Sequence, residues 1–439
     1  MRVWPLRGGV HPPEKKFSAD SVIEVLPVPD EIVVPLSMHL GAPAKPVVQG
    51  GDEVRLGQII AEPAGFISAY IHSPVSGTVR KIEPRDHPLG RALPCIIIDN
   101  DGRDEAVDFT PIADWRNVAP DTLLDIVFKA GVVGMGGATF PTHVKLNPPA
   151  KFKIDTVIAN GVECEPYLTA DHRLMLEQPD NLLEGLRIAL HILGVAKGYI
   201  GIEKNKPDAI ALLREKTRDA GDIEVVPLRV RYPQGAEKQL IYACTKRQVP
   251  SGGLPMNVGC VVQNVGTLAT IRDAIILGRP VIERIVTVTG EAIAQPKNFL
   301  VRLGTPIRDL IEAAGGTKEP PAKIISGGPM MGLAQHTRTV PIIKGSSGVL
   351  CLPESLVEII DPGPCLRCGH CVSVCPVGLP ATDLARLVEG EKIEAAETLG
   401  LMDCIECGSC AFACPSHISL VQWIRIGKAE AMARKKKTS

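Results

Sequence analysis

Two cysteine-rich stretches carry the clearest chemical signal in this sequence of 439 residues. They read CLRCGHCVSVCP and CIECGSCAFACP and span 365–376 and 404–415. In each stretch three cysteines recur at intervals of three, a fourth cysteine follows four residues later, and a proline comes next. This is the spacing of thiolate ligands to [4Fe-4S] clusters, so the chain is predicted to hold two clusters and to transfer electrons.

One tight loop can bind only one face of a cubane cluster, so the fourth ligand must come from elsewhere. Where two such runs occur together, the distant cysteine of each run binds the cluster of the other. Pro376 and Pro415 are predicted to begin helices, because the first turn of a helix tolerates a missing N–H. The predicted ligands are Cys365, Cys368, Cys371 and Cys414 for cluster 1, and Cys404, Cys407, Cys410 and Cys375 for cluster 2.

Two other uses of cysteine fit this pattern less well. Structural zinc sites use two separated Cys-x-x-Cys pairs and have no role for a third cysteine at the next interval. Disulfide frameworks are typical of small domains in an oxidising compartment. Iron-sulfur clusters are therefore the favoured interpretation, with structural zinc as the alternative. The other five cysteines are expected to be reduced and mostly buried: Cys95, Cys164, Cys244, Cys260 and Cys351.

Composition limits the remaining possibilities. The chain is 45% hydrophobic and has a formal net charge of -1, which suits several domains with apolar cores and does not favour nucleic-acid binding. The first residues lack the apolar stretch of a secretory signal. The most apolar longer segment carries charged residues, so no lipid-embedded span is expected. Any membrane contact is predicted to be indirect, through partner proteins.

A glycine-rich loop is the second chemical signal. The segment GVVGMGGATFPTHVKL, residues 131–146, places Gly136 and Gly137 in a turn and Lys145 after Phe140 and Pro141. Backbone N–H groups in such a loop can face a phosphate, and the lysine can neutralise its charge. The spacing is neither that of Walker A nor that of the Rossmann fingerprint. On these residues alone, nucleotide or flavin binding remains open.

The segments around this loop alternate between helix and strand. Residues 121–131 and 208–221 have the period of amphipathic helices. Residues 153–161, 197–203 and 224–232 read as short buried strands. This order predicts an α/β layer with a partly parallel sheet.

The regions on either side are expected to be smaller units. Residues 1–115 hold short β-like runs, and GGDEVRLGQ and SPVSGTV resemble the turns of a biotinyl/lipoyl-type barrel-sandwich hybrid, or hammerhead. No lysine lies between Gln58 and Val79, so this unit is expected to dock or support rather than carry a cofactor. Residues after Arg279 read as strand, turn, strand and helix closed by Gly315 and Gly316, and resemble a β-grasp (SLBB) domain.

The central region resembles the flavin- and NADH-binding 51 kDa subunit of respiratory complex I. Its loop is similar to that family's GRGGAGFPTGLKW segment, IANGVECEPYLT to CNADEGEPGT, and YPQGAEKQL and VVQNVGTLAT to the GEE and INNVET segments. The resemblance implies that Gly136, Gly137, Ala138, Phe140 and Lys145 line the nucleotide and flavin crevice. It also implies that a second set surrounds a non-covalent FMN: Asn160, Glu163, Glu165, Gly235, Glu237, Gln263, Asn264 and Thr267.

Three positions depart from that family. Val162 stands where the family has Asp, Ala236 where it has the first Glu of GEE, and Gln263 where it has the first Asn. The hydrogen bonding to FMN and nicotinamide is therefore expected to differ.

The order of parts is similar to that of the RnfC family, a peripheral component of Rnf electron-transport complexes. HPPEKK, PLSMHLGAP, SGGPMMG and both cysteine runs carry this resemblance. It implies a multidomain α/β and α+β fold with four domains: a barrel-sandwich hybrid over 1–115, an FMN/NADH-binding α/β domain over 116–278, a β-grasp domain over 279–350, and a bacterial-type 2[4Fe-4S] ferredoxin domain with a C-terminal helix over 351–439.

The same resemblance implies a function and partners. The chain would pass electrons between NAD(H), FMN and two [4Fe-4S] clusters in an ion-translocating NADH:ferredoxin oxidoreductase, since a flavin can exchange two electrons with NADH and one with a cluster. Expected partners are other Rnf subunits, especially the ferredoxin-like B subunit and the membrane subunits, and ferredoxin. The expected place is the cytoplasmic face of the bacterial inner membrane. Two alternatives are a soluble flavin reductase of a small molecule such as cobalamin, and an iron-sulfur relay or scaffold without its own nucleotide site.

Overall fold

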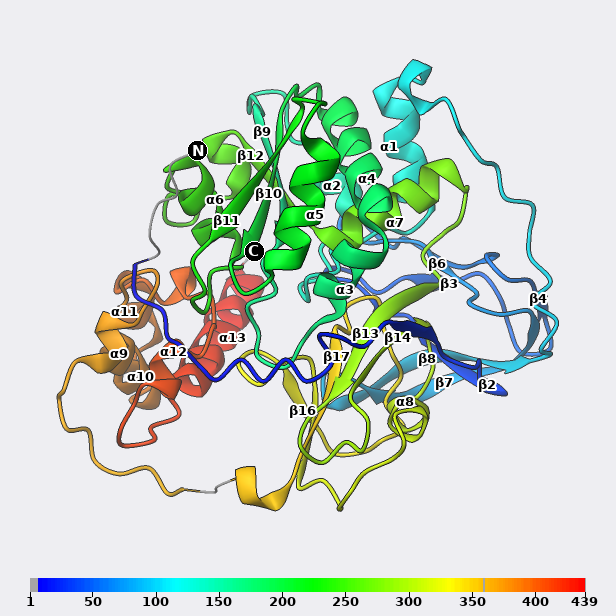
Figure 1. Cartoon of the computed structure of the whole chain (residues 1–439). Coiled ribbons are helices and arrows are strands. Elements are labelled where there is room, and N and C mark those ends of the chain that lie inside the picture. Colours follow the sequence, from blue (N-terminus) through cyan, green and yellow to red (C-terminus); the bar gives the residue numbers. More distant parts are fainter. Residues whose placement is uncertain (1–6, 358–359, 439) are drawn as a thin grey trace.

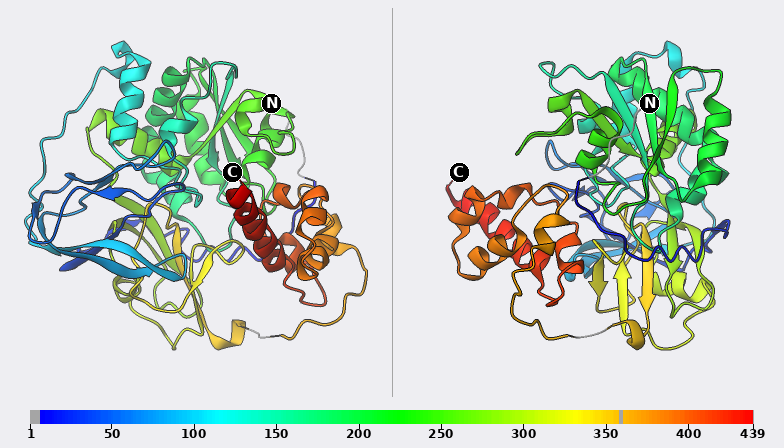
Figure 2. Two further views of the ribbon diagram at one scale, coloured as in Figure 1. Left: turned by 180° about the vertical axis from the view of Figure 1, so that it is seen from behind. Right: turned by 60° about the vertical axis from the view of Figure 1, so that its left-hand side comes forward.

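The computed structural model describes residues 7–357 and 360–438, except for the side chains of 436–438. Trp4, Pro5 and Leu6, which open the predicted hammerhead, lie outside the described residues. Four regions follow one another along the chain, and the last forms a lobe joined to the rest by an extended segment (Figures 1 and 2). The predicted combination of α/β and α+β regions is confirmed.

The N-terminal region folds into two small antiparallel sheets, ordered β2-β8-β7-β4 and β3-β5-β6. The consecutive β8 residues Cys95, Ile96, Ile97 and Ile98 are all fully buried, so this strand is covered on both faces. The strands are β2 (Glu31–Pro35), β3 (Lys45–Pro46), β4 (Glu53–Val54), β5 (Ile59–Glu62), β6 (Ile71–His72), β7 (Gly77–His87) and β8 (Arg91–Asn100).

The second region is the predicted α/β layer, and its sheet is parallel throughout, in the order β11-β10-β9-β12. Helices α4, α5 and α7 pack on one face and α6 on the other. The helices are η1 (Trp115–Asn117), α1 (Pro120–Lys129), α2 (Thr142–Lys145), α3 (Ala170–Glu177), α4 (Pro179–Leu193), α5 (Pro207–Thr217), α6 (Glu237–Thr245), η2 (Pro255–Val258) and α7 (Val265–Ile276). The strands are β9 (Thr156–Gly161), β10 (Gly198–Glu203), β11 (Ile223–Leu228) and β12 (Cys260–Asn264).

Close packing of α4 on α7 depends on a glycine. A Cβ atom on Gly185 would lie 1.9 Å from the carbonyl oxygen of Leu268, so any side chain there would push the two helices apart. The parallel sheet and this helix pair bring the C-terminal ends of β9 and β12 to one edge, where ligands of such sheets bind.

The third region contains the expected strand, turn, strand and helix. Its sheet has the order β1-β14-β13-β17-β15-β16. The glycine-rich segment 326–332 connects β15 to β16, and Gly315 and Gly316 follow α8 with φ of 77° and 73°. The elements are β13 (Glu283–Thr289), β14 (Lys297–Arg302), α8 (Ile307–Ala313), β15 (Lys323–Ser326), β16 (Leu333–Gln335), β17 (Gly348–Leu352) and η3 (Glu354–Leu356).

The first residues do not stay with the N-terminal barrel. The N–H of Gly9 donates to the carbonyl of Val374 in the last lobe, Val10 bridges to Tyr232, and β1 (Ile23–Val25) pairs in parallel with β14. The chain therefore touches the other three regions before it enters the barrel, as the dark blue trace in Figure 2 shows.

The last lobe is helical. Helix α13 packs against α10, and Leu420 and Ile424 are buried on that side. The helix continues through the basic run at its end, where the exposed Arg434 pairs with Glu394. The elements are α9 (His370–Ser373), α10 (Ala381–Glu389), α11 (Ile393–Thr398), η4 (Leu401–Asp403), α12 (Ser409–Phe412) and α13 (Leu420–Thr438).

Candidate flavin and iron-sulfur sites

The two cysteine loops share one backbone shape. Each loop has positive φ at the same three positions of the repeated motif, and two of these residues in the first loop and one in the second are glycines. The pairs are Arg367 (56°) with Glu406 (57°), Gly369 (77°) with Gly408 (75°), and Gly378 (75°) with His417 (53°). Residues other than glycine, such as Arg367, Glu406 and His417, rarely adopt this conformation unless the fold requires it, so the two loops are built to the same geometry.

The structure brings the four predicted ligands of cluster 2 together. Cys375 from the first stretch and Cys404, Cys407 and Cys410 from the second line one cavity with about 350 Å³ of empty space. The rest of its wall includes the apolar residues Leu379, Val421 and Ile424. Burial, reinforced by the neighbouring cysteines, raises the pKa of the Cys404 thiol to about 11 and that of Cys410 to about 12. Four thiols in an apolar cavity fit a cluster, whose iron would displace their protons.

The predicted ligands of cluster 1 are less enclosed. Cys371 is buried, Cys365 and Cys414 are half-buried, and Cys368 is exposed. The segment before Cys365 is held beside the segment after Cys414, because the N–H of Gly363 donates to the carbonyl of Ser416 and the Ser416 hydroxyl donates to that of Pro364. This contact agrees with the predicted exchange of ligands between loops, and the assignment of these four cysteines stays a prediction.

The prediction for the two prolines was wrong. Pro376 and Pro415 lie in tight turns, closed by the N–H of Gly378 on the carbonyl of Cys375 and by that of His417 on Cys414. Helices α10 and α13 begin several residues later, at Ala381 and Leu420. The first of these turns leaves Cys375 beside the cysteines of the second loop.

The glycine-rich loop docks on the C-terminal end of β12. The N–H of Met135 donates to the Thr267 hydroxyl (2.9 Å), and a Cβ on Gly136 would lie 3.6 Å from that of Asn264. Gly137 has φ of 104° and open space around it, which only glycine adopts without strain. Gly136, Gly137 and Ala138 are exposed and Phe140 is half-buried, so a ligand can reach this backbone.

Two pairs of predicted residues meet beside this loop. Lys145 Nζ forms an ion pair with Glu237 at the start of α6 (2.7 Å) and also donates to the carbonyl of Val262 on β12. The side-chain amide of Asn160 donates to the carbonyl of Gly235 (2.8 Å). The ends of β9 and β12, α2 and the start of α6 therefore form one site at the expected edge of the sheet.

Both predicted glutamates are engaged within the protein. The Glu163 carboxylate accepts the N–H groups of Asp171 and His172 at the start of α3. The Glu165 carboxylate accepts those of Met330 and Met331 in the loop between β15 and β16, and burial raises the pKa of Glu165 to about 7. These carboxylates hold loops in place, and their predicted contact with FMN stays a prediction.

Gln263 gives the clearest test of whether a flavin fits. It is only 1% exposed, and neither its side-chain oxygen nor its nitrogen has a hydrogen-bond partner in the described part of the chain. A buried amide without partners is costly unless something else satisfies it. FMN has both donors and acceptors on its ring system. Together with the open glycine backbone and Lys145, this orphaned amide fits a bound flavin.

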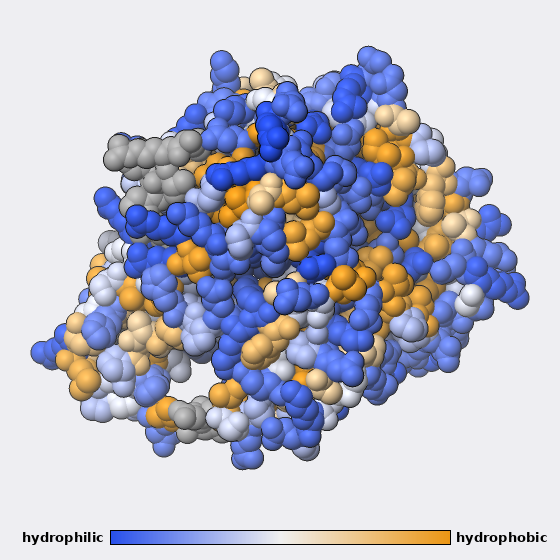
Figure 3. Space-filling model, in the orientation of Figure 1, coloured by the Kyte–Doolittle hydropathy of each residue, from blue (hydrophilic) through white to orange (hydrophobic). Residues whose placement is uncertain are grey.

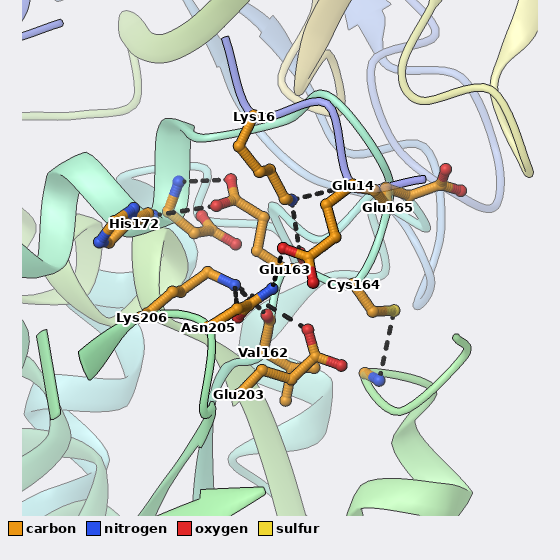
Figure 4. A network of polar contacts seen from close by, with 12 residues as sticks. Glu14, Lys16, Val162, Glu163, Cys164, Glu165, His172, Glu203, Asn205 and Lys206 are labelled. Atoms are coloured by element: carbon orange, nitrogen blue, oxygen red, sulfur yellow. Dashed lines mark hydrogen bonds and ion pairs between the residues drawn. The ribbon is translucent and has the colours of Figure 1, made fainter. Parts of the chain in front are cut away.

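Two lysines that sequence reasoning missed, the half-buried Lys16 and the buried Lys206, hold the loop 162–168 (Figure 4). Lys16 Nζ donates to the carbonyls of Glu163, Glu165 and Leu168 at 2.7–3.0 Å, and burial lowers the pKa of Lys16 to about 8. Lys206 Nζ donates to the carbonyl of Val162 (2.8 Å). Lys16 belongs to the motif HPPEKK, but only the fold shows which groups Lys16 binds.

A third lysine, the buried Lys344, connects the barrel, the flavin region and the β-grasp region. Lys344 Nζ donates to the carbonyls of Tyr70 in the barrel (2.6 Å) and Gly131 at the start of the glycine-rich loop (2.7 Å). A Cβ on the next residue, Gly345, would lie 2.5 Å from the side chain of Thr139. The barrel also touches this loop, since the N–H of Leu40 donates to the carbonyl of Thr139. The barrel and the β-grasp region thus support the glycine-rich loop. For the barrel, these contacts agree with the expectation that it docks or supports and does not carry a cofactor.

Four family models match the chain in this order. They are the RnfC barrel sandwich hybrid domain over residues 4–103, the Nuo51 FMN-binding domain over 127–273, the SLBB domain over 285–334, and the 4Fe-4S dicluster domain over 358–415. The predicted fold classes and the FMN and iron-sulfur cofactors are confirmed. The predicted boundaries and individual site residues stay predictions.

Curated relatives are similar along almost the whole chain. The C subunit of the proton-translocating ferredoxin:NAD(+) oxidoreductase complex of Clostridium ljungdahlii is 50% identical over 97% of this chain and 94% of its own length. The C subunit of the Na(+)-translocating complex of Acetobacterium woodii is 45% identical over 98% of both chains. The C subunit of the ion-translocating oxidoreductase complex of Rhodobacter capsulatus is 41% identical over 99% of this chain and 84% of its own.

Among solved structures, an NAD+-reducing [NiFe]-hydrogenase in the H2-reduced state has a TM-score of 0.50 and 20% identity, covering 73% of this chain and 63% of that one. That similarity concerns the fold alone. The four domain matches and the identities of 41–50% to whole subunits settle the family. The chain belongs to the RnfC family, the C subunits of the ion-translocating (Rnf) oxidoreductase complexes.

Proposed function

We propose that this chain passes electrons between NAD(H), FMN and two [4Fe-4S] clusters, as a subunit of an ion-translocating ferredoxin:NAD oxidoreductase. The observation that carries the proposal is the contact between the flavin site and the cavity of cluster 2. Helix α6 begins with Glu237, the ion-pair partner of Lys145, and two residues later the Gln239 amide donates to the carbonyl of Pro376, next to Cys375 (3.0 Å). One short helix thus touches both sites.

A second contact joins the same two sites. Cys407 packs in one apolar cluster with Val10, Tyr232 and Cys164. Cys164 lies in the loop 162–168, which the lysines Lys16 and Lys206 hold in place. The flavin region and the cluster 2 loop are therefore in direct contact on two sides.

The chain's own residues have distinct tasks in this proposal. The open backbone of Gly136 and Gly137 would hold the FMN phosphate or ring, and Lys145 would offset negative charge. Gln263 would hydrogen-bond the flavin, while Asn160, Asn264 and Thr267 shape the loops around the site. When bound, FMN supplies the exchange of two electrons with a nicotinamide and of one electron with a cluster. The apolar residues around the thiols exclude water, which tunes the cluster potential.

The partners are other subunits of the Rnf complex. The ferredoxin-like B subunit and ferredoxin are the specific partners we propose, and the cytoplasmic face of the inner membrane is the proposed location. None of the described helices is long and apolar enough to cross a membrane. Contact with the bilayer through the membrane subunits is consistent with that finding.

Anaerobic purification of the chain tests the proposal. Iron, sulfide and non-covalent FMN are quantified, NADH is added, and the bleaching of the flavin and cluster absorbance is followed. Two clusters and one FMN per chain that bleach with NADH support an NADH-facing role. Full clusters without FMN, or an FMN indifferent to NADH, would make the chain a relay instead. Rapid turnover of cobalamin would favour the small-molecule reductase.

A further inference from the structure

The two cysteine loops have the same backbone but differ in burial. We name residues 365–371 the outer loop and residues 404–410 the inner loop. Cys368 is exposed, whereas its counterpart Cys407 is buried. His370 is exposed, whereas its counterpart Ser409 is fully buried. Since the motif and the positive-φ positions match, this difference comes from what surrounds each loop.

The rest of the chain covers the inner loop. Val10, Tyr232 and Met330 pack with Cys407, and a Cβ on Gly408 would lie 3.1 Å from the carbonyl oxygen of Met330. Just before the loop, the Asp403 carboxylate accepts hydrogen bonds from the Ser251 hydroxyl and the Gly252 N–H. The flavin and β-grasp regions therefore cover this loop with an apolar surface.

Nothing in the described chain covers the outer loop in the same way. Its Leu366 is 67% exposed, and Val372 on α9 and Phe412 on the adjacent α12 are 44% and 51% exposed. Apolar side chains reach the surface at the left-hand edge of Figure 3, over the segment that leads into α9. Apolar side chains around a proposed cluster are unusual for a surface that faces only water.

Charge points to the kind of partner. Glu406 of the inner loop has ion-pair partners within the chain, Arg425 and Lys428 on α13. Arg367, its counterpart in the outer loop, is exposed, and no described residue forms an ion pair with it. A partner that completes the outer loop as the chain completes the inner one would bring apolar side chains and a carboxylate opposite Arg367.

We propose that the outer loop, with Val372 and Phe412, is the surface on which a redox-carrying subunit of the same complex docks, while the inner loop faces the flavin site. This inference rests on the proposed function. One electron then moves, in either direction, between the cluster of the outer loop and a one-electron centre of that subunit, with no bond made and no proton moved. The occupant we infer is a subunit of the complex, because similar chains are C subunits of multi-subunit oxidoreductases and the exposed surface surrounds Cys368, a proposed cluster ligand, and Arg367, which a partner carboxylate can meet.

Reconstitution tests the docking surface. Membrane vesicles that contain the other subunits, from cells lacking this chain, are mixed with purified full-length chain, and the bound fraction is measured by co-sedimentation. Leu366→Asp and Arg367→Glu are each expected to weaken binding about tenfold or more, because the first places a carboxylate in an apolar contact and the second reverses the charge that meets the partner's carboxylate. Val25→Asp is the matched control, because Val25 is 76% exposed on β1, away from the loop, and should bind as wild type does.

The outcomes separate this inference from the proposed function. Iron content and the EPR spectrum show whether each variant keeps both clusters. If Leu366→Asp loses a cluster, the binding test relies on Arg367→Glu. Wild-type binding by cluster-loaded Leu366→Asp and Arg367→Glu would overturn the docking surface. Equal weakening by Val25→Asp would overturn it as well. Binding does not require NADH, so a chain whose flavin ignores NADH but which loses binding on Leu366→Asp would contradict only the proposed function.

Discussion

At the scale of single residues, buried polar groups show where a ligand belongs. Gln239 and Gln263 are both buried glutamines, but the Gln239 amide donates to the carbonyl of Pro376 while Gln263 has no partner among the described residues. Because an unsatisfied buried amide costs about 1–3 kcal/mol, the folded chain keeps Gln263 at a cost that a ligand can offset.

Gln263→Leu is expected to separate stability from binding. Removing an unsatisfied amide should leave the thermal midpoint of the FMN-free chain unchanged or higher, while FMN affinity falls about tenfold, the value of one lost hydrogen bond in a buried site. Fluorescence titration with FMN and a thermal melt measure the two effects. Gln239→Leu is the control and should lower the midpoint. An FMN affinity equal to wild type in Gln263→Leu would remove Gln263 from the flavin site.

Gly137→Ala is expected to weaken FMN binding without unfolding the chain. Its φ of 104° strains any other residue, and forcing such a residue costs about 1–2 kcal/mol, which the exposed loop relieves by moving. Gly221→Ala, at a turn with φ of 68° and equally open space, is the control and should bind FMN normally. The measurement is the ratio of the FMN dissociation constant of Gly137→Ala to that of Gly221→Ala. A ratio near one would contradict a role of the glycine-rich loop in FMN binding.

At the scale of elements, the mostly extended N-terminal segment, residues 9–25, holds separate regions of the protein together. Residues 9–25 contact the last lobe, the flavin region and the β-grasp sheet in turn. The two adjacent lysines of HPPEKK, Lys15 and Lys16, make different contacts. Lys15 forms a partly exposed ion pair with Glu291, while Lys16 satisfies three carbonyls of the loop 162–168.

Lys16→Met is expected to loosen the flavin site, and Lys15→Met is not. Without Lys16, three carbonyls lose their donor at a cost of about 1–3 kcal/mol or more, whereas a partly exposed ion pair contributes at most about 1 kcal/mol. Hydrogen exchange should rise in 162–168 only in Lys16→Met, with FMN affinity lowered at least about fivefold. The same exchange pattern in both variants would show that the segment does not act through Lys16.

At the scale of the whole molecule, Lys344 of the β-grasp region connects that region to the barrel and to the flavin region. It is fully buried, its ammonium group donates to Tyr70 and Gly131, and burial lowers its pKa to about 7. The unfolded lysine keeps its proton to about pH 10.5. Between these values the unfolded chain binds a proton that the folded chain gives up, so this group makes the folded state more stable as pH rises.

A comparison of wild type with Lys344→Met isolates that effect. The free energy of unfolding of wild type minus that of the variant should rise from pH 7 to pH 9 by at most about 1.4 kcal/mol per pH unit, and the difference in their thermal midpoints at a fixed scan rate should rise with it. Below pH 7 the difference should be flat, because the lysine is then charged in both states. A difference that stays constant from pH 7 to pH 9 would mean that Lys344 stays charged in the folded protein.

Local patterns made much of this protein predictable. Cysteine spacing depends on contacts within one loop, so the cluster chemistry could be predicted from 365–376 and 404–415 alone. Helix and strand periods depend on neighbouring residues, so the α/β layer could be predicted too. The roles of Glu163, Glu165 and Pro376 were not predictable in this way, since each depends on residues far along the chain.

The sequence by itself determined which chemistry this chain can perform and in what order its parts occur, because motif spacing and turn residues act over short distances. Only the tertiary structure decided which surfaces are covered. It placed Cys375 with Cys404, Cys407 and Cys410, packed Cys407 of the inner loop against the flavin region, and left residues 366–370 of the outer loop exposed in the described part of the chain. Two copies of one motif cannot differ in this way by local rules, since their burial depends on what folds against them.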